Sequence, residues 1–392
     1  MKNDLVRLDI KDRLLVSLDD AAEAVGKTPH NIRDYIQRGR IGKYNLGGDA
    51  IEKAAPGQLR IDLHELQEFL KLVAVGEEKH HHAGLNAELG FYGLAERERT
   101  KHVHRVHPYL GKFIPQLVEW FLANYFHEND IIIDPFMGSG TTLVQSNEMK
   151  MHSIGVDVSD FNCLIARVKT AKYSVQEARK EILEVEGRTS RFSRRLVSKS
   201  PEYPLFDDED FDKFKQGLLA ECDSDYLRKW FAPRALLQML YYRRLIHTGT
   251  YKYGELLRVL LSRAVRSSRL IPHNDLATPK APLPVGIHYW CKKHNRMCLP
   301  IADCITKIHA YSEDTARRIG KFNELRSDKT VTVLRGDSRS IDLSPYLNGR
   351  KANGIFTSPP YVGQIDYHDQ HIYAYELFGI PRQCFANNSS PH

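Results

Sequence analysis

The sequence Ile-Ile-Ile-Asp-Pro-Phe-Met-Gly-Ser-Gly-Thr-Thr occupies residues 131–142. Three β-branched apolar residues are typical of the end of a buried parallel strand, and Asp134 stands where that strand ends. Gly138 and Gly140 allow the backbone to turn tightly and to approach a ligand without a Cβ in the way. The two threonines then begin a helix. The stretch predicts a strand–loop–helix site for a nucleoside-containing cofactor at the carboxyl edge of an α/β sheet.

This loop lacks the features of a phosphate-binding loop. No Lys-Ser/Thr follows the glycines, and no GxGxxG is present. Three later apolar runs, 152–158, 331–338 and 354–357, predict further strands that end in polar groups, namely Asp157, Asp337 and Ser358. A carboxylate about twenty residues beyond a glycine-rich turn, as at Asp157, is well placed for ribose hydroxyls. Four strands are therefore expected to present polar side chains at one edge of the sheet.

Length and charge narrow the functional class. The 392 residues can hold two or three domains, and the six cysteines are too few for a disulfide framework in so long a chain. No apolar run of about 18 residues and no apolar signal core are present, which predicts a cytoplasmic protein without a membrane span. The net charge is +7, yet residues 226–300 contain fourteen Lys/Arg and two acids. Such a basic region is expected to face a polyanion.

Residues 1–75 predict a small helix-turn-helix domain. Ser17 caps a first short helix, Thr28 caps a second, and residues 59–72 add a strand and a helix. The pattern resembles excisionase-like and MerR-like DNA-binding domains, in which the second helix enters the major groove. It leaves polar and basic side chains available for DNA, namely Lys27, His30, Asn31, Arg33 and Arg38. A helical interaction domain that touches no DNA is the alternative, because twelve bases balance twelve acids in residues 1–75.

The rest of the chain divides into a cofactor region with a long interruption. Polar residues 76–100 predict a linker, and strand–helix alternation then occupies residues 101–173. The alternation stops over residues 174–330, which predict a mainly helical, basic insert with an acidic loop at 202–225. Insertions of this length in a cofactor domain usually carry the substrate-reading surface. The alternation resumes in residues 331–392, which contain the last two expected strands.

The motif Ser358-Pro359-Pro360-Tyr361 follows the last of these strands. Two prolines fix the backbone so that a carbonyl points outward without a ladder partner, and the serine hydroxyl lies beside it. The tyrosine supplies a flat face for stacking. Two fixed acceptors can draw an exocyclic amino nitrogen toward a tetrahedral form, which frees its lone pair. The motif therefore suits chemistry on an amino group of a base.

The motifs Asp-Pro-Phe-Met-Gly-Ser-Gly-Thr-Thr and Thr-Ser-Pro-Pro-Tyr together resemble those of the amino-group DNA methyltransferases. These enzymes use S-adenosylmethionine to make N4-methylcytosine or N6-methyladenine. The resemblance covers residues 102–173 and 331–380 and implies a Rossmann-like methyltransferase sheet acting on a base flipped out of double-stranded DNA. It implies a cofactor site formed by Phe113, Pro115, Asp134, Phe136, Gly138, Gly140, Asp157 at the ribose and Asp337 at the adenine amino group. It implies that Ser358, Pro359, Pro360 and Tyr361 hold the target base.

The target base and the biological role stay open at the sequence level. Serine at the first position of the motif favours cytosine N4 over adenine N6, and the class implies a restriction–modification system with a partner endonuclease. Most SPPY-type cytosine enzymes resemble the reverse motif order, in which the catalytic strand precedes the cofactor loop. Alternatives are a DNA-binding regulatory protein or inactive fragment that keeps the fold, and methylation of RNA or of a protein amide.

The basic insert is the expected DNA-facing region. The residues proposed for phosphate or base contact are Arg243, Arg244, Arg263, Arg266 and Arg269, because few acids lie nearby in the sequence to pair with them. One cluster in this insert has metal-like spacing, formed by Cys291, His294, Cys298 and Cys304. The spacing is not that of a paired Cys-x2-Cys ribbon. The cysteines are therefore interpreted as ordinary thiols rather than metal ligands, with zinc as the alternative.

The sheet is expected to be incomplete at its C-terminal side. A methyltransferase sheet of this type has about seven strands, whereas the sequence predicts four. Residues 362–392 are too few to add three more strands with helices. Either a second polypeptide completes the sheet, or the chain is a truncated or frameshifted product. The isolated chain is expected to be inactive, or weakly active and prone to association.

Overall fold

The computed structural model describes residues 8–10, 13–37, 41–51, 57–70, 91, 99–197, 208–273, 275–276, 279–359 and 367–381. The chain forms two compact units, Met1–Tyr92 and Gly93–His392, and each is considered by itself. None of the helices in the described ranges is long and apolar enough to cross a bilayer.

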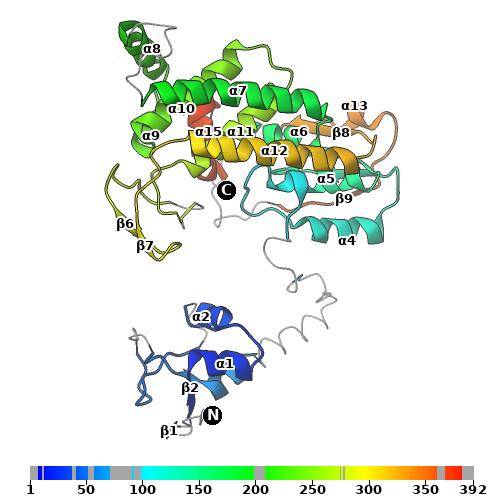
Figure 1. Cartoon of the computed structure of the whole chain (residues 1–392). Helices are drawn as coiled ribbons and strands as arrows, with labels where there is room; N and C mark the ends of the chain where they lie inside the picture. The colour runs from blue at the N-terminus through cyan, green and yellow to red at the C-terminus, as the bar shows by residue number, and fades with distance from the viewer. Residues whose placement is uncertain are drawn as a thin grey trace, which may run out of the picture. The chain divides into compact units, whose positions relative to one another are not determined.

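The first unit combines a short sheet with a helix pair (Figure 1). Strands β1 (Leu8–Ile10), β2 (Arg13–Val16) and β3 (Ile61–Asp62) are antiparallel, followed by a helical stretch at 63–70. Helices α1 (Leu18–Ala24) and α2 (Pro29–Gln37) pack through an apolar core that contains Ala21, Ile32, Ile61 and Leu66. Both predicted helix caps are present, because Ser17 Oγ accepts from Asp20 N at 3.2 Å and Thr28 Oγ1 accepts from Asn31 N at 3.3 Å. Arg33 is exposed on α2, and Arg38 lies outside the described residues.

The second unit is built on a parallel sheet whose strand order is β8-β5-β4-β9. Its strands are β4 (Ile131–Asp134), β5 (His152–Asp157), β8 (Val331–Arg335) and β9 (Gly354–Ile355). All four predicted strands are in place. The chain moves outward from β4 through β5 to β8 and then returns to the other side of β4 at β9. The strand order therefore reverses between β4 and β9.

Three helices cover one face of this sheet. The strand register places Ile132, Val331 and Val333 on the same face. These residues pack in apolar clusters with α4 (Pro115–Tyr125), α5 (Thr141–Glu148) and α6 (Asp160–Thr170). On the opposite face, at the edge strand β9 of the described sheet, Ile355 is 65 % exposed.

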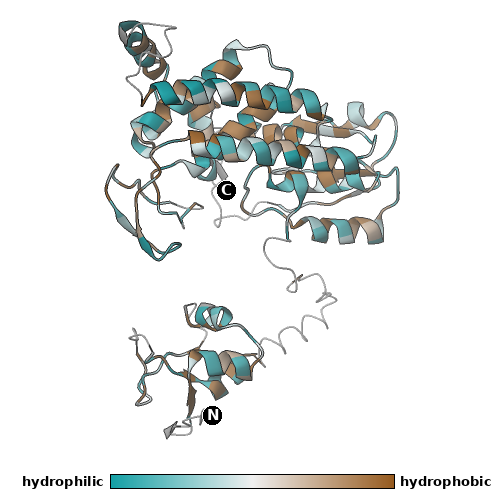
Figure 2. Cartoon of the chain, in the orientation of Figure 1, coloured by the Kyte–Doolittle hydropathy of each residue, from teal (hydrophilic) through white to brown (hydrophobic). Residues whose placement is uncertain are grey.

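The helical insert forms the main apolar core of the unit. Its helices are α7 (Val175–Arg195), α8 (Asp208–Ala220), α9 (Asp225–Trp230), α10 (Pro233–Thr248), α11 (Gly254–Ser267) and α12 (Ile305–Leu325), with a hairpin β6 (Tyr289–Cys291) and β7 (Arg296–Cys298) before α12. Apolar residues of α10 and α11 lie beneath α7 and α12 (Figure 2). The prediction of a loop throughout 202–225 is wrong over α8, because Phe211 and Leu218 recur at helical spacing and pack with Phe192.

The segments around the sheet complete the unit. A 3₁₀ turn η2 (His102–Arg105) precedes α4, and a short helix α13 (Ser344–Leu347) lies between β8 and β9. Helices α14 (Tyr367–Gln370) and α15 (Ile372–Phe378) follow β9. Tyr373 and Leu377 of α15 are buried in the core cluster of the insert. The chain therefore leaves the sheet after β9 and packs against the helical layer.

Candidate functional site

The two sequence motifs meet where the strand order reverses. Ligands of open α/β sheets bind beyond the carboxyl ends of strands at such a point. Asp134 ends β4, and Thr357 and Ser358 come two and three residues after the end of β9. Thr357 Oγ1 donates a 2.6 Å hydrogen bond to Asp134 Oδ1, across 223 residues of sequence. The structure thus brings Thr357, the residue before Ser358, to the acid that precedes the glycine-rich loop.

Asp134 is a buried acid with neutral partners. It is 3 % exposed, and besides Thr357 it accepts from the backbone N–H of Phe136 at 3.2 Å. Burial raises the pKa of this carboxyl, while the hydrogen bonds from these donors oppose the rise. A carboxyl in this state is sensitive to any donor that a ligand brings, because no basic side chain of the described region already compensates its charge.

The glycines of the loop are fixed by close contacts. Gly138 and Gly140 have φ values of +51° and +75°. A Cβ on Gly138 would lie 3.1 Å from the Tyr109 hydroxyl, and a Cβ on Gly140 would lie 3.0 Å from the Ala166 Cβ. The first glycine therefore lies under an aromatic ring and the second lies against α6. Both positions need the absence of a side chain, as the sequence predicts.

Asp157, at the end of β5, holds the glycine-rich loop through a hydrogen bond. Its Oδ2 accepts from Gly138 N at 3.0 Å, and its Oδ1 accepts from Ser159 N at 2.8 Å and from Asn162 Nδ2 at 3.1 Å. Burial raises the pKa of Asp157 to about 6 in spite of these bonds. A carboxylate has about four acceptor sites, so one remains on Oδ2 for a ligand hydroxyl.

The other predicted cofactor residues occupy different positions around this site. Phe113 lies with its ring centroid 5.2 Å from that of Phe356, and Pro115 is buried at the first turn of α4. Phe136 is 41 % exposed. Asp337 follows β8, two strands from the reversal point, and its half-buried carboxylate pairs with Arg339, which holds its pKa at about 2. The structure therefore places most of the predicted cofactor residues near β4 and β5, and it places Asp337 toward the β8 edge of the described sheet.

The residues predicted to hold the target base are described only in part. Ser358 is half-buried and Pro359 is exposed, directly after the Thr357–Asp134 hydrogen bond. Pro360 and Tyr361 lie outside the described residues.

Sequence reasoning missed several residues that hold the loop. Tyr109 covers Gly138 and accepts from Asn162 Nδ2 at 3.2 Å. Lys169, fully buried on α6, donates to the backbone carbonyl of Ser139 at 2.8 Å, and burial lowers its pKa well below the usual value. A signal for Lys169 exists, because it lies four positions after Ile165 on the inward face of its helix. Tyr109 leaves no comparable signal in the sequence.

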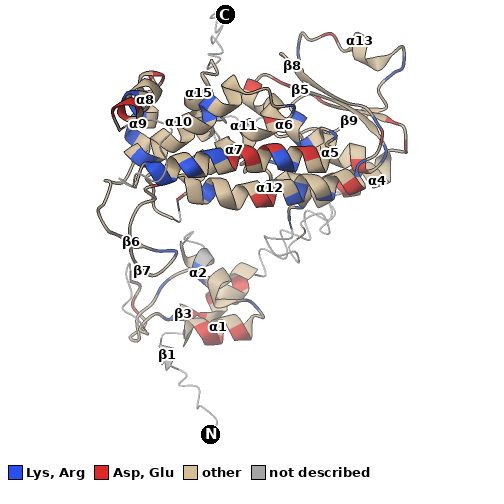
Figure 3. Ribbon diagram, turned by 45° about the horizontal axis from the view of Figure 1, so that its top comes forward, with Lys and Arg blue, Asp and Glu red and all other residues tan. Residues whose placement is uncertain are grey.

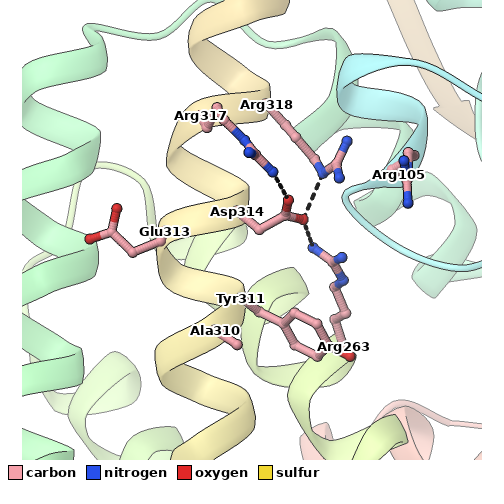
Figure 4. A pocket seen from close by; sticks show the side chains of 8 residues that line it. All are labelled: Arg105, Arg263, Ala310, Tyr311, Glu313, Asp314, Arg317 and Arg318. Atoms are coloured by element: carbon pink, nitrogen blue, oxygen red, sulfur yellow. Dashed lines mark hydrogen bonds and ion pairs between the residues drawn. The ribbon is translucent and has the colours of Figure 1, made fainter.

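The insert contains an open pocket of about 600 Å³ lined by arginines (Figure 4). Asp314 of α12 lies at its centre and accepts from Arg263 at 2.7 Å and from Arg318 and Arg317 at 2.6 Å. Arg318 and Arg263 hold the pKa of Asp314 at about 2 against the effect of burial. The remaining lining residues are Arg105, Ala310, Tyr311 and Glu313. Four arginines against two acids leave the lining net positive.

The other arginines predicted to contact DNA differ in exposure. Arg269 is 3 % exposed and donates to the carbonyls of Arg266 and Leu276, so its position does not match the expected DNA-facing surface. Arg243 and Arg244 share Glu221 as an acidic partner. Acids and bases are interspersed along α7 and α12 (Figure 3). The expectation that too few acids lie nearby to pair these arginines is wrong, because Glu221 and Asp314, from other helices of the insert, pair with Arg243, Arg244 and Arg263.

The metal-like cluster also changes in composition. Cys291, His294 and Cys298 converge, and His273 joins them. Cys304 lies instead in the apolar core at the start of α12, where its backbone N–H donates to Gln238 Oε1 at 2.6 Å. His273 therefore replaces Cys304 in the predicted set of four residues.

Comparison with known proteins now decides the family. The sequence model of the N6/N4 DNA methylase family matches residues 88–167, which include β4, its loop and β5. Type II methyltransferase M.MjaII of Methanocaldococcus jannaschii is 38 % identical over 421 residues, covering 90 % of this chain and 76 % of that protein. The chain belongs to the type II DNA methyltransferase family.

Two further relatives of this methyltransferase are more distant. Type II methyltransferase M.MvaI of Kocuria varians is 31 % identical over 104 residues, which cover 26 % of this chain and 22 % of that protein. Type II methyltransferase M.BsoBI of Geobacillus stearothermophilus is 22 % identical over 290 residues, or 72 % and 53 % of the two chains. No solved structure matches the methyltransferase at a significant level.

Proposed function

We propose that this methyltransferase transfers a methyl group from S-adenosylmethionine to the exocyclic amino group of a flipped base in duplex DNA, with cytosine N4 preferred over adenine N6. The observation that carries the proposal is the 2.6 Å hydrogen bond from Thr357 to Asp134, which brings the Ser358 segment to the cofactor loop. Amino-group chemistry follows from the residue types at that position. Serine in place of an acid or amide favours cytosine.

The chain's own groups suit an amino nitrogen. The Ser358 hydroxyl and an outward carbonyl fixed by the prolines accept the two amino hydrogens of the base. This polarisation frees the nitrogen lone pair, which is otherwise delocalised into the ring. Tyr361, by the family resemblance, stacks on the base. S-adenosylmethionine supplies the electrophilic methyl group when it is bound.

The loop fits this cofactor by its shape and its polar atoms. The absence of a Cβ at Gly138 allows the Tyr109 ring to lie directly against the loop. Within the described region, the buried hydroxyls of Ser139 and Thr141 have no hydrogen-bond partner. Asp157 keeps acceptor capacity suited to ribose hydroxyls, and Asp134 can accept from a ligand amino group. Asp337 is the proposed partner of the adenine amino group, with Phe113, Pro115 and Phe136 lining the cofactor.

Base analysis of methylated DNA tests this proposal. DNA from cells with and without the gene is digested to nucleosides and measured by mass spectrometry. We expect N4-methylcytosine with the wild-type gene and at least about a 100-fold loss with Ser358→Ala. Ser344→Ala, at an exposed position on α13, is the matched control and keeps activity. N6-methyladenine alone would establish the adenine alternative. Absence of both products, with no cofactor binding in calorimetry, would favour the regulatory alternative.

DNA contact is proposed at two places. In the second unit, the arginine pocket offers Arg105, Arg317 and their neighbours to phosphates. In the first unit, the exposed face of α2 offers Arg33 to the major groove. Deleting residues 1–75 tests the proposed contact of α2 with DNA. A drop in DNA affinity with unchanged cofactor affinity is expected, whereas unchanged DNA affinity would favour a protein-interaction domain.

Two protein partners belong to the same proposal. A restriction endonuclease with the same target sequence is the expected functional partner. A second polypeptide that pairs with β9 is supported by the 65 % exposure of Ile355 at that edge strand. Mass photometry of the purified chain, compared with Ile355→Lys, tests whether this edge mediates association. Loss of a larger species in the variant supports the contact, and identical monomeric masses refute it.

A further inference from the structure

Four potential metal ligands converge at the hairpin that precedes α12. His273, Cys291, His294 and Cys298 each offer one ligand atom, and these atoms all lie within 4.8 Å of one another. Three contacts are resolved: Cys291 Sγ to His273 Nδ1 at 3.6 Å, Cys291 Sγ to His294 Nδ1 at 3.5 Å, and His294 Nδ1 to Cys298 Sγ at 3.4 Å. Two thiols and two imidazoles are thus arranged around one point.

The separations agree with a tetrahedral metal site. Zinc binds thiolate sulfur at about 2.3 Å and imidazole nitrogen at about 2.0–2.1 Å. Tetrahedral angles between such bonds place sulfur and nitrogen about 3.6 Å apart. The three resolved contacts, from 3.4 to 3.6 Å, fall at this value.

Hydrogen bonding alone explains the cluster poorly. His294 Nδ1 contacts both Cys291 Sγ and Cys298 Sγ, yet one ring nitrogen has a single in-plane site for a proton or a lone pair. Cys291 Sγ in turn faces the Nδ1 atoms of both histidines. A cation shared by all four groups satisfies every contact at once.

The backbone builds the site from a tight hairpin and one distant residue. The short strands β6 and β7 pair in antiparallel register, Tyr289 with Cys298 and Cys291 with Arg296. The turn between them brings His294 back, with its N–H donating to Cys291 O at 3.2 Å, and Asn295 has a φ of +50°. His273, which follows α11, is held by its own N–H, which donates to the Tyr289 hydroxyl at 2.9 Å.

The hairpin has little else to stabilise it. Each strand has three residues, and an isolated two-stranded hairpin is marginal in water. Its apolar side chains Trp290 and Met297 are exposed, and no residue of either strand belongs to an apolar core cluster of the described residues. Small elements without a core are commonly fixed by a structural metal, whose binding energy becomes folding energy.

We propose that His273, Cys291, His294 and Cys298 bind one Zn²⁺ as a closed structural site. The donor set of two sulfurs and two imidazole nitrogens is typical of structural zinc, and four protein ligands leave no open position for a reacting water. The ion ties the hairpin to the segment that leaves α11. The exposed Trp290, Lys292 and Lys293 are thereby held in fixed positions at the end of the insert.

Metal analysis of the full chain, purified without a metal-chelate column, tests the proposal. We expect about one zinc per wild-type chain by plasma mass spectrometry, and less than about a fifth of that in His273→Ala and in Cys291→Ala. Cys304→Ala is the matched control, because that thiol lies in the core, and it keeps the metal. Equal zinc in the wild type and both ligand variants, or none in the wild type after incubation with excess zinc, overturns the site.

Two measurements on the wild type cover the case in which ligand variants fail to fold. Replacement by Co²⁺ should give the intense visible absorption of tetrahedral cobalt with thiolate ligands. Chelation of the native metal should make two further thiols reactive toward a disulfide reagent, those of Cys291 and Cys298. Cobalt absorption of the weak octahedral type, or thiol reactivity that a chelator leaves unchanged, refutes the assignment.

Discussion

The carboxyl edge of the sheet and the pocket between α11 and α12 both contain partly or fully buried carboxylates, but the two regions compensate them differently. At the sheet edge, Asp134 and Asp157 are held by neutral donors, and burial raises the pKa of each. In the insert, Asp314 is held by three arginines, and its pKa is about 2.

This difference separates ligand chemistry from architecture. A carboxyl with neutral partners keeps an unfavourable free energy of ionisation that a bound ligand can relieve, which is common at functional sites. A carboxyl inside a set of cations is already compensated, and its removal leaves several charges uncompensated. We therefore expect substitutions at the sheet edge to affect cofactor binding first and substitutions in the insert to affect stability first.

The largest effect on cofactor binding and activity is expected for Asp134→Asn. The amide keeps the size of the side chain but cannot accept as a carboxylate from both Thr357 and a ligand amino group. We expect cofactor affinity and methylation rate to fall at least about 100-fold, which is about 2.7 kcal/mol. Calorimetry and a methyl-transfer assay measure the two quantities. Asp328→Asn, with a carboxyl 89 % exposed, is the control. Unchanged cofactor affinity in Asp134→Asn would remove this acid from the site.

Asp314→Ala should have the largest effect on stability. It leaves Arg263 and Arg318, whose side chains are each 12 % exposed, without their carboxylate. Removal of one partner from a buried ion pair costs about 3 kcal/mol or more. Urea unfolding followed by tryptophan fluorescence reports this unit, because all three tryptophans lie in residues 93–392.

Arg317→Ala provides the comparison for Asp314→Ala. Its side chain is 74 % exposed, so its pair with Asp314 should contribute no more than about 0.5 kcal/mol. A similar loss of stability in both variants would mean that the pocket is not organised around its acid.

A smaller, pH-dependent effect is expected at Asp157. Its pKa in the folded chain is about 6, above the ordinary value of 3.8, so the folded state binds more protons than the unfolded state between these values. The contribution of this residue to stability therefore falls as the pH rises from about 4 to about 6, by up to about 3 kcal/mol. Asp157→Asn removes the titration.

The measurement for Asp157 is the difference in the free energy of unfolding between the wild type and Asp157→Asn across this pH range. Other acids titrate in both proteins and cancel in the difference. The wild type should gain stability relative to the variant as the pH falls from 7 to 4. A difference that does not vary with pH would show that burial does not raise the pKa of Asp157.

The sheet edge could be predicted from the sequence because its signals are local. Strand, acid and glycines are adjacent in 131–142, and the second motif directly follows a strand. The insert could not be predicted as well, because its decisive contacts are distant. Asp314 lies 51 residues from Arg263. His273 lies 18 residues before Cys291, outside the short segment that has the metal-like spacing of Cys291 to Cys304. Acidic residues at the start of α8 hid the helical spacing of Phe211 and Leu218.

The smallest effect on stability is expected for Arg244→Ala, which sharpens the comparison within the insert. Its guanidinium lies 3.6 Å from Glu221, and both side chains are about two-fifths exposed, so the pair should contribute less than about 0.5 kcal/mol. A loss above about 1 kcal/mol would instead make Arg244 part of the architecture, like Arg263. If Arg244 contacts a phosphate, the variant should bind DNA more weakly. The plot of log affinity against log salt concentration should also become shallower, by about 1 in slope. Stability without DNA and affinity across a salt series therefore separate the two roles of an arginine in this insert.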